Sequence, residues 1–169
     1  VAIDYREMAP KNAHRDMFLD ENGNVDNKKA QFSHLSSGVP GTVAGLSHAL
    51  EKYGTMSWKQ VVEPSIKLAE QGILVSYDLA ENLKSRRVWL TSNPATTKAF
   101  YKNNAVPYEP RETLVQRDLA WSLQQLAQHG PSAFYQGAIA KKIAAEMKVN
   151  GGLITLDDLA NYRVSEREA

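Results

Sequence analysis

The stretch that decides the fold class runs from residue 42 to residue 54 and reads TVAGLSHALEKYG. Its apolar residues recur at spacings of three and four, which is typical of one face of an α-helix. These residues are Val43, Leu46, Ala49, Leu50 and Tyr53. Thr42 stands where an N-cap would act, and Gly54 stands where a C′ residue would end the helix. The pattern therefore predicts an amphipathic helix.

Similar signals continue toward the C-terminus. A Ser57–Gln60 capping box precedes an apolar run, but Pro64 falls inside that run, so we expect a kink or two short helices. Further helices are predicted to begin near Ser76, Asn93 and Thr155 and to include residues 119–126 and 139–147.

Strand signals lie at the two ends of the chain. Residues 1–5 alternate between apolar and polar side chains, and a similar pattern begins at residues 163–167. The polar stretch 10–38 contains a turn signal at residues 20–24 and is predicted to form an irregular loop or a loose hairpin. The predicted fold class is mainly α, with short terminal strands.

The composition is that of an ordinary globular protein, with 43% hydrophobic and 23% charged residues among 169. Twenty basic and 19 acidic side chains are spread along the chain, so nothing indicates a nucleic-acid partner. No apolar run approaches the roughly 20 residues that span a bilayer. The absence of cysteine excludes disulfides, thiolate metal sites and a cysteine nucleophile.

The chain opens at Val1, already inside a strand-like pattern, and closes where another strand begins. We therefore expect residues 1–169 to be one segment from the interior of a longer protein, truncated at both ends. No composition shift or linker marks an internal domain boundary.

Several candidate sites fail on residue type or spacing. The histidines lack the close spacing of a helical zinc site, and Val25 and Gln31 occupy positions where a calcium loop needs Gly and Glu. Residues 36–42 precede a helix and could present amides to an anion, but a tight turn is the favoured interpretation. No G-x-S-x-G motif is present. No metal site or catalytic residue is predicted.

Arg6 is the strongest candidate for binding, because it directly follows the first strand-like run. A guanidinium offers a planar fork that can bind a carboxylate at two points. The alternative is a local ion pair with Asp4 or Glu7, which the residues alone favour.

Four segments of the chain together favour the binding role of Arg6 over the local ion pair, because they resemble, in order, segments of γ-glutamyltranspeptidases. The first, residues 1–10, contains Asp4-Tyr5-Arg6-Glu7 and ends in Ala9-Pro10, similar to the family's D-[FY]-R-E-x-A-P pattern. The others are residues 36–45 with Tyr53-Gly54, residues 130–137, and residues 151–155 with Asp158-Leu159 and Tyr162.

The resemblance implies part of the large subunit of a self-cleaving enzyme with the α-β-β-α four-layer fold of N-terminal-nucleophile hydrolases. In that family the N-terminal threonine of the small subunit attacks a γ-glutamyl amide, such as that of glutathione. The γ-glutamyl-enzyme then passes its acyl group to water, an amino acid or a peptide. The resemblance implies no metal or cofactor, a small-subunit partner and a periplasmic or secreted location.

One residue role carries over by position. Arg6 occupies the place of the family arginine that binds the α-carboxylate of the glutamyl group. Residues 36–41 are assigned to scaffold. The nucleophile lies outside the segment, which alone should be inactive.

Two alternatives stay open at this point. One is another acylase of the same superfamily, such as a cephalosporin acylase or a poly-γ-glutamate-processing enzyme. The other is a helical interaction module without enzymatic activity.

Overall fold

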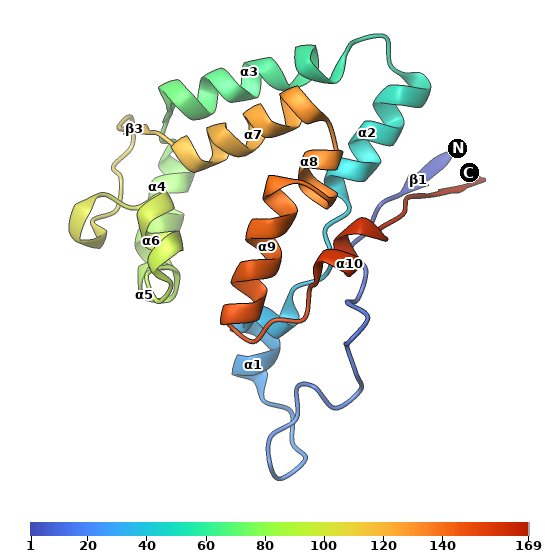
Figure 1. Ribbon diagram of the computed structural model, residues 1–169. Coiled ribbons are helices and arrows are strands. Elements are labelled where there is room, and N and C mark those ends of the chain that lie inside the picture. Colours follow the sequence, from blue (N-terminus) through green and yellow to red (C-terminus); the bar gives the residue numbers. More distant parts are fainter. Residues whose placement is uncertain (169) are drawn as a thin grey trace. The chain divides into compact units, whose positions relative to one another are not determined.

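The computed structural model describes residues 1–168, which are mainly helical (Figure 1). The α-helices are α1 (Asn27–Phe32), α2 (Thr42–Tyr53), α3 (Trp58–Gln71), α4 (Tyr77–Ser85), α5 (Arg87–Leu90), α6 (Pro94–Phe100), α7 (Arg117–His129), α8 (Ser132–Tyr135), α9 (Ala138–Val149) and α10 (Leu156–Ala160). Short 3-10 helices cover His34–Ser36 and Asn103–Ala105. The strands are β1 (Ala2–Asp4), β2 (Ile73–Leu74), β3 (Thr113–Leu114) and β4 (Ser165–Arg167).

The chain divides into two compact units. The first unit combines Val1–Val61 with the chain from Gln125 onward, and the second is Val62–Gln124. Both boundaries fall inside continuous helices, α3 and α7. The expectation of one segment without an internal domain boundary therefore stays a prediction.

The two strands predicted at the ends of the chain pair with each other. β1 and β4 are antiparallel, with Ile3 opposite Glu166, and they run side by side near the two chain ends in Figure 1. The terminal strand signals are thus confirmed. The second sheet pairs β2 with β3 and was not predicted, since two-residue strands are too short to show an alternating pattern.

The core of the first unit gathers side chains from segments that are distant in the sequence. Its buried members are Val39, Tyr135, Ala140, Ile154, Leu159 and Tyr162. Leu159 of α10 is fully buried. This short C-terminal helix is therefore fixed by packing, because so few residues would not hold a helix by propensity alone.

Side-chain caps bear out the predicted helix starts near Ser76, Asn93 and Thr155. Ser76 accepts a hydrogen bond from the Leu79 amide, and Asn93 accepts from the amides of Ala95 and Thr96. At Thr155 the cap is reciprocal with Asp158.

Helix α2 begins one residue earlier than its predicted N-cap at Thr42 implied. Thr42 is its first helical residue and Gly41 is its N-cap. A β-carbon at position 41 would lie 2.0 Å from the Tyr162 hydroxyl, so no side-chain cap fits there. Gly54 ends the helix in an extended conformation, as its C-cap.

Pro64 does not divide α3, which continues through it as one helix. A proline inside a helix forfeits its own backbone hydrogen bond. The buried side chains of Val62, Ile66 and Ala69 lie on either side of Pro64 and stabilise the helix across it.

The polar stretch contains the predicted loose hairpin and an unpredicted helix. The Asp20 amide donates to the Asn24 carbonyl at 2.8 Å, and the Asp20 carboxylate accepts from the amides of Asn22 and Asn24. Asp26 then caps α1 by accepting from the Lys29 amide. The cap was visible in the sequence, but a six-residue helix carries too few apolar positions to reveal itself.

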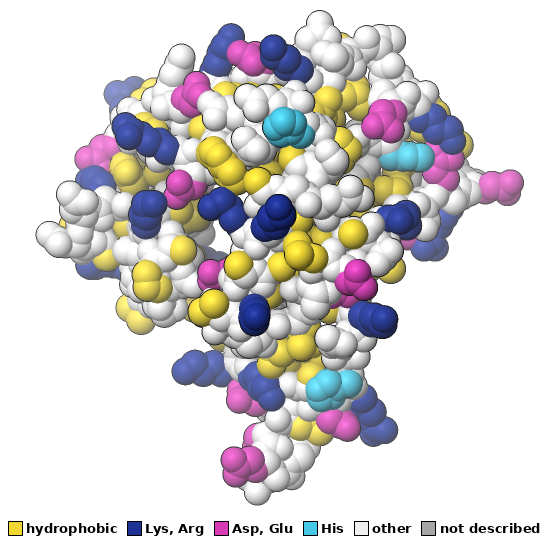
Figure 2. Space-filling view, in the orientation of Figure 1, with side chains coloured by type: hydrophobic (Ala, Val, Ile, Leu, Met, Phe, Trp, Pro, Cys, Tyr) yellow, Lys and Arg dark blue, Asp and Glu magenta, His cyan; other side chains and the backbone are white. Residues whose placement is uncertain are grey.

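Basic and acidic side chains are interspersed over the face shown in Figure 2. Within residues 1–168, no helix combines the length and apolar character that a membrane crossing would need.

The capping box of α10 gives a test of local stability. The Asp158 amide donates to the Thr155 hydroxyl at 3.2 Å, and the Thr155 amide donates to Asp158 at 2.8 Å. Thr155→Ala in the whole protein should lower the free energy of unfolding by about 1 kcal/mol in urea titrations. Thr155→Ser keeps the hydroxyl and should restore most of the loss; equal losses in both variants would contradict the cap's role.

Candidate functional site

Arg6 lies two residues after the end of β1, and both of its backbone polar groups are engaged. Its amide donates to the Asp4 carboxylate at 3.2 Å, and its carbonyl accepts from the Tyr162 hydroxyl at 2.8 Å. Two residues later, Met8 and Val39 exchange backbone hydrogen bonds of 3.2 and 2.7 Å. The backbone of Arg6 is therefore held on both sides, between the β1–β4 pair and this bridge.

The side chain of Arg6 forms the local ion pair that was the alternative interpretation. Its Nη2 lies 2.9 Å from Glu7 Oε1, with the two side chains 82% and 56% exposed. The pKa of the Glu7 carboxyl is lowered, first by its own backbone amide and then by Arg6. A pair this exposed contributes little stability and can be replaced by another carboxylate at small cost.

Arg6 lines an open cleft of about 680 Å³. One wall comes from the exit of β1, and the other comes from the turn that leads into α2. The lining residues are Ile3, Asp4, Tyr5, Arg6, Glu7, Gly38, Pro40, Gly41 and Thr42. Because α2 begins at Thr42, the N-terminus of this helix lies in the second wall, where it contributes partial positive charge.

The two walls approach so closely because glycines stand at their contact points. A β-carbon at Gly38 would lie 2.8 Å from Glu7 Cγ, and one at Gly45 would lie 2.2 Å from the ring of Tyr5. At Gly41 the Tyr5 carbonyl would be 2.1 Å away. The φ of Gly41 is −107°, which other residues also adopt, so the need for glycine at this position comes from the close approach. Gly45 likewise lets α2 pack closely against Tyr5.

Two buried tyrosines support the cleft from the core. The rings of Tyr135 and Tyr162 stack with centroids 5.7 Å apart. Tyr135 donates to the Pro40 carbonyl at 2.8 Å and accepts from the Ala44 amide at 3.1 Å. Burial raises the pKa of both hydroxyls, and the carboxylates of Asp4 and Glu7 add to the effect at Tyr162.

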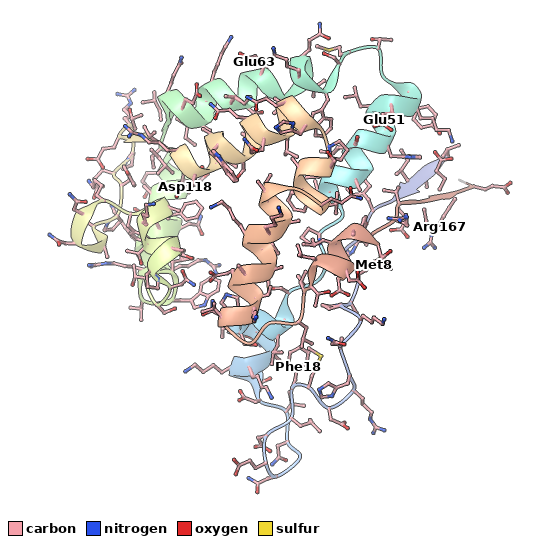
Figure 3. The ribbon with its side chains drawn as sticks, in the orientation of Figure 1. Met8, Phe18, Glu51, Glu63, Asp118 and Arg167 are labelled. Atoms are coloured by element: carbon pink, nitrogen blue, oxygen red, sulfur yellow. The ribbon has the colours of Figure 1, made fainter. Side chains whose placement is uncertain are left out.

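Glu166 of β4 ties the strand pair to α2. Its carboxylate accepts from His48 at 2.7 Å, from Tyr53 at 3.2 Å and from Lys52. The hydrogen bond from Lys52, followed by that from His48, lowers the pKa of Glu166 to about 2. The neighbouring Arg167, labelled in Figure 3, pairs with Asp4 of β1. β4 is thereby linked both to α2, which begins in the opposite wall, and to β1, the strand that precedes Arg6.

Metal-ligand geometry is not found in the part of the chain that the structure describes. Across residues 1–168, no group of three or more histidine or acidic side chains is placed to hold a metal ion.

The four segments singled out in the sequence converge on this cleft. Residues 1–10 and 36–45 form its walls, and the other two segments contribute Tyr135 and Tyr162 beneath them. A family model described as gamma-glutamyltranspeptidase matches residues 1–169. The chain belongs to the gamma-glutamyltranspeptidase family.

Sequence and structure relatives agree with this membership. The "Glutathione hydrolase proenzyme" of Escherichia coli K12 is 52% identical over 166 residues, covering 98% of this chain and 29% of the relative. The gamma-glutamyltranspeptidase of Helicobacter pylori superposes with a TM-score of 0.94 at 44% identity, covering 96% of this chain and 47% of the other. One from Pseudomonas nitroreducens, complexed with L-DON, gives 0.88 at 34% identity over the same shares.

These likenesses confirm the predicted fold class, a mainly helical segment of the N-terminal-nucleophile hydrolase fold. The chain spans less than half the length of these relatives. Sequence reasoning placed Arg6 in its motif but gave no role to Tyr135 and Tyr162. The sequence signal for these two tyrosines was that both lie in segments that resemble the family.

The Glu166 cluster predicts a pH-dependent contribution to stability. A folded-state pKa of about 2 lies below the ordinary value of 4.5, so ionised Glu166 stabilises the fold fully above about pH 4.5 and less as the pH falls toward 2. Glu166→Gln cannot ionise. The difference in unfolding free energy between wild type and Glu166→Gln, from urea titrations, should therefore shrink across that window. A difference that stayed constant would contradict the assignment.

Proposed function

We propose that the whole protein transfers or hydrolyses the γ-glutamyl group of glutathione and related amides through a γ-glutamyl-enzyme. This segment contributes scaffold and Arg6, which binds the α-carboxylate of the glutamyl group. The observation that carries the proposal is the exposed guanidinium of Arg6, on a backbone fixed at the wall of a cleft. Family membership supports the reaction class.

The electrostatics of the cleft suit a carboxylate bound at Arg6. The guanidinium fork can accept a carboxylate at two points, and the N-terminus of α2 adds partial positive charge to the same lining. The carboxylate of Glu7 already makes a single contact of this kind, from Oε1 to Nη2 of Arg6 at 2.9 Å. A substrate α-carboxylate would replace or share that contact.

Holding the α-carboxylate fixes one end of the glutamyl group and so orients its γ-amide toward a nucleophile. In the proposal that nucleophile is the N-terminal threonine of a small subunit, released when the precursor cleaves itself. A free α-amino group at such a threonine can serve as its own general base. No metal or cofactor takes part in the proposed reaction.

Exposed apolar side chains in the first unit support a partner subunit. Leu46, Tyr53 and Met56 are each more than half exposed. Large apolar side chains left in contact with solvent at neighbouring positions are typical of surfaces that another chain covers. In the proposal the small subunit of the same precursor supplies that cover.

We also propose a periplasmic or secreted location, following the family resemblance. The absence of cysteine is compatible with an oxidising compartment.

The alternatives receive less support. An independent interaction module would not need an arginine presented in a cleft by two segments that match an enzyme family. A cephalosporin acylase would not need an α-carboxylate at Arg6, so the role of Arg6 argues against that alternative. A poly-γ-glutamate-processing enzyme has a substrate with free α-carboxylates, and the choice of acyl substrate in the activity assay distinguishes it.

The role of Arg6 gives the direct test. Arg6→Ala in the whole protein should lower kcat/KM for glutathione hydrolysis about ten- to a hundredfold, since it removes a charge-assisted contact worth about 1.5 to 3 kcal/mol. The measurement is glutamate release, with a mass check that each variant still yields two subunits.

Arg15→Ala is a matched control, because Arg15 is also an exposed arginine beside a carboxylate, that of Asp16. It should leave kcat/KM unchanged. Equal effects of the two substitutions would contradict the carboxylate-binding role of Arg6. A precursor that stays uncleaved would argue against the self-processing chemistry.

A further inference from the structure

The carbonyl of Arg6 is held by a side chain from the far end of the segment. The Tyr162 hydroxyl donates to it at 2.8 Å across a sequence separation of 156 residues. Tyr162 is buried, with 6% of its surface exposed. This hydroxyl therefore makes a specific contact to the backbone that carries the guanidinium.

The position of the Tyr162 hydroxyl is itself tightly constrained. On one side it lies where a β-carbon of Gly41 would be 2.0 Å away, so the turn leaves no spare room. On its face the ring stacks against Tyr135, with the two planes 13° apart. Lateral movement of the hydroxyl would thus disturb both the turn and the core.

The segment that carries Tyr162 is also held by hydrogen bonds of its own backbone and of helix α10. Its amide donates to the Leu159 carbonyl at 3.2 Å, and Leu159 is fully buried. In the first turn of α10, Asp158 accepts from the Lys11 amide at 2.8 Å. Helix α10 is therefore also hydrogen-bonded to Lys11, which follows Met8 in the chain. Figure 3 labels Met8 beside this helix.

The guanidinium by contrast has little support of its own. The side chain of Arg6 is 82% exposed, and its ion pair is with the adjacent Glu7, which moves with the same backbone. The direction in which the fork points then depends on how well the backbone of residue 6 is fixed. Of its two backbone hydrogen bonds, one is donated to its carbonyl by the buried Tyr162, and the other is donated by its amide to the nearby Asp4.

We propose that Tyr162 is a positioning residue for substrate binding, holding the backbone of Arg6 so that the guanidinium meets the α-carboxylate. This inference rests on the proposed function of Arg6. Loss of the hydroxyl leaves the Arg6 carbonyl without that donor and loosens the residue. Small displacements of a positioning group weaken productive binding, so the effect falls on KM for substrates with an α-carboxylate.

The test compares two substrates in the whole protein. One is a γ-glutamyl amide, and the other is the 4-aminobutyryl amide with the same leaving group, which lacks only the α-carboxylate. Tyr162→Phe should lower the ratio of their kcat/KM values about two- to tenfold, mainly through KM of the γ-glutamyl amide. The inhibition constants of L-glutamate and 4-aminobutyrate give the same comparison from binding alone.

Tyr101→Phe is the matched control. Tyr101 is also a buried tyrosine, 5% exposed, and its hydroxyl donates to the Leu83 carbonyl at 2.7 Å in the second unit. The substitution removes the same kind of hydrogen bond far along the chain from Arg6. It should lower stability to a similar extent and leave the substrate ratio unchanged.

The variants separate failure of this inference from failure of the proposed function. Support requires that Arg6→Ala and Tyr162→Phe both lower the ratio, and that the double variant is no lower than Arg6→Ala alone. If Arg6→Ala lowers the ratio but Tyr162→Phe affects both substrates equally or neither, the positioning role is overturned. If Arg6→Ala leaves the ratio unchanged, the binding role of Arg6 and this inference both fall.

Discussion

Position 41 has no room for a β-carbon, and much of the first unit depends on that constraint. The Tyr162 hydroxyl and the Tyr5 carbonyl would lie 2.0 and 2.1 Å from such an atom. Real β-carbons do not approach other atoms this closely, so only glycine lets the exit of β1, the start of α2 and the chain after α10 meet. The cleft, the tyrosine pair and the fixed backbone of Arg6 all follow from that meeting.

The cleft is held by buried hydrogen bonds and packing more than by its ion pairs. The pair of Arg6 with Glu7 is largely exposed, and that of Asp4 with Arg167 is partly exposed; exposed pairs are weak and exchangeable. Tyr135 and Tyr162 are buried, and their hydroxyls are bonded to backbone groups, so removing one hydroxyl deprives a carbonyl at the cleft of its donor. The two tyrosine hydroxyls therefore fix the backbone of the cleft walls, including that of Arg6. The guanidinium of Arg6 stays exposed and, in the proposal, can exchange Glu7 for a substrate carboxylate.

Local signals in the sequence predicted most of the helices, because caps and apolar faces act over a few residues. The caps at Ser76, Asn93 and Thr155 are examples. The alternative of two short helices at Pro64 was wrong, because burial on both sides keeps α3 continuous, and α1 was missed because it is too short to show a period. Arg6 was found because its motif is contiguous. The bond from Tyr162 to Arg6 joins distant segments, and single-sequence spacing carries no information about it.

The central claim is that Arg6 receives the α-carboxylate of the glutamyl group. A crystal structure of the whole protein with bound L-glutamate tests it most directly. The account predicts the α-carboxylate within about 2.7 to 3.2 Å of the Arg6 guanidinium nitrogens, with the Tyr162 hydroxyl still donating to the Arg6 carbonyl. Glutamate bound with its α-carboxylate on other groups, and Arg6 still paired with Glu7 alone, would contradict the account.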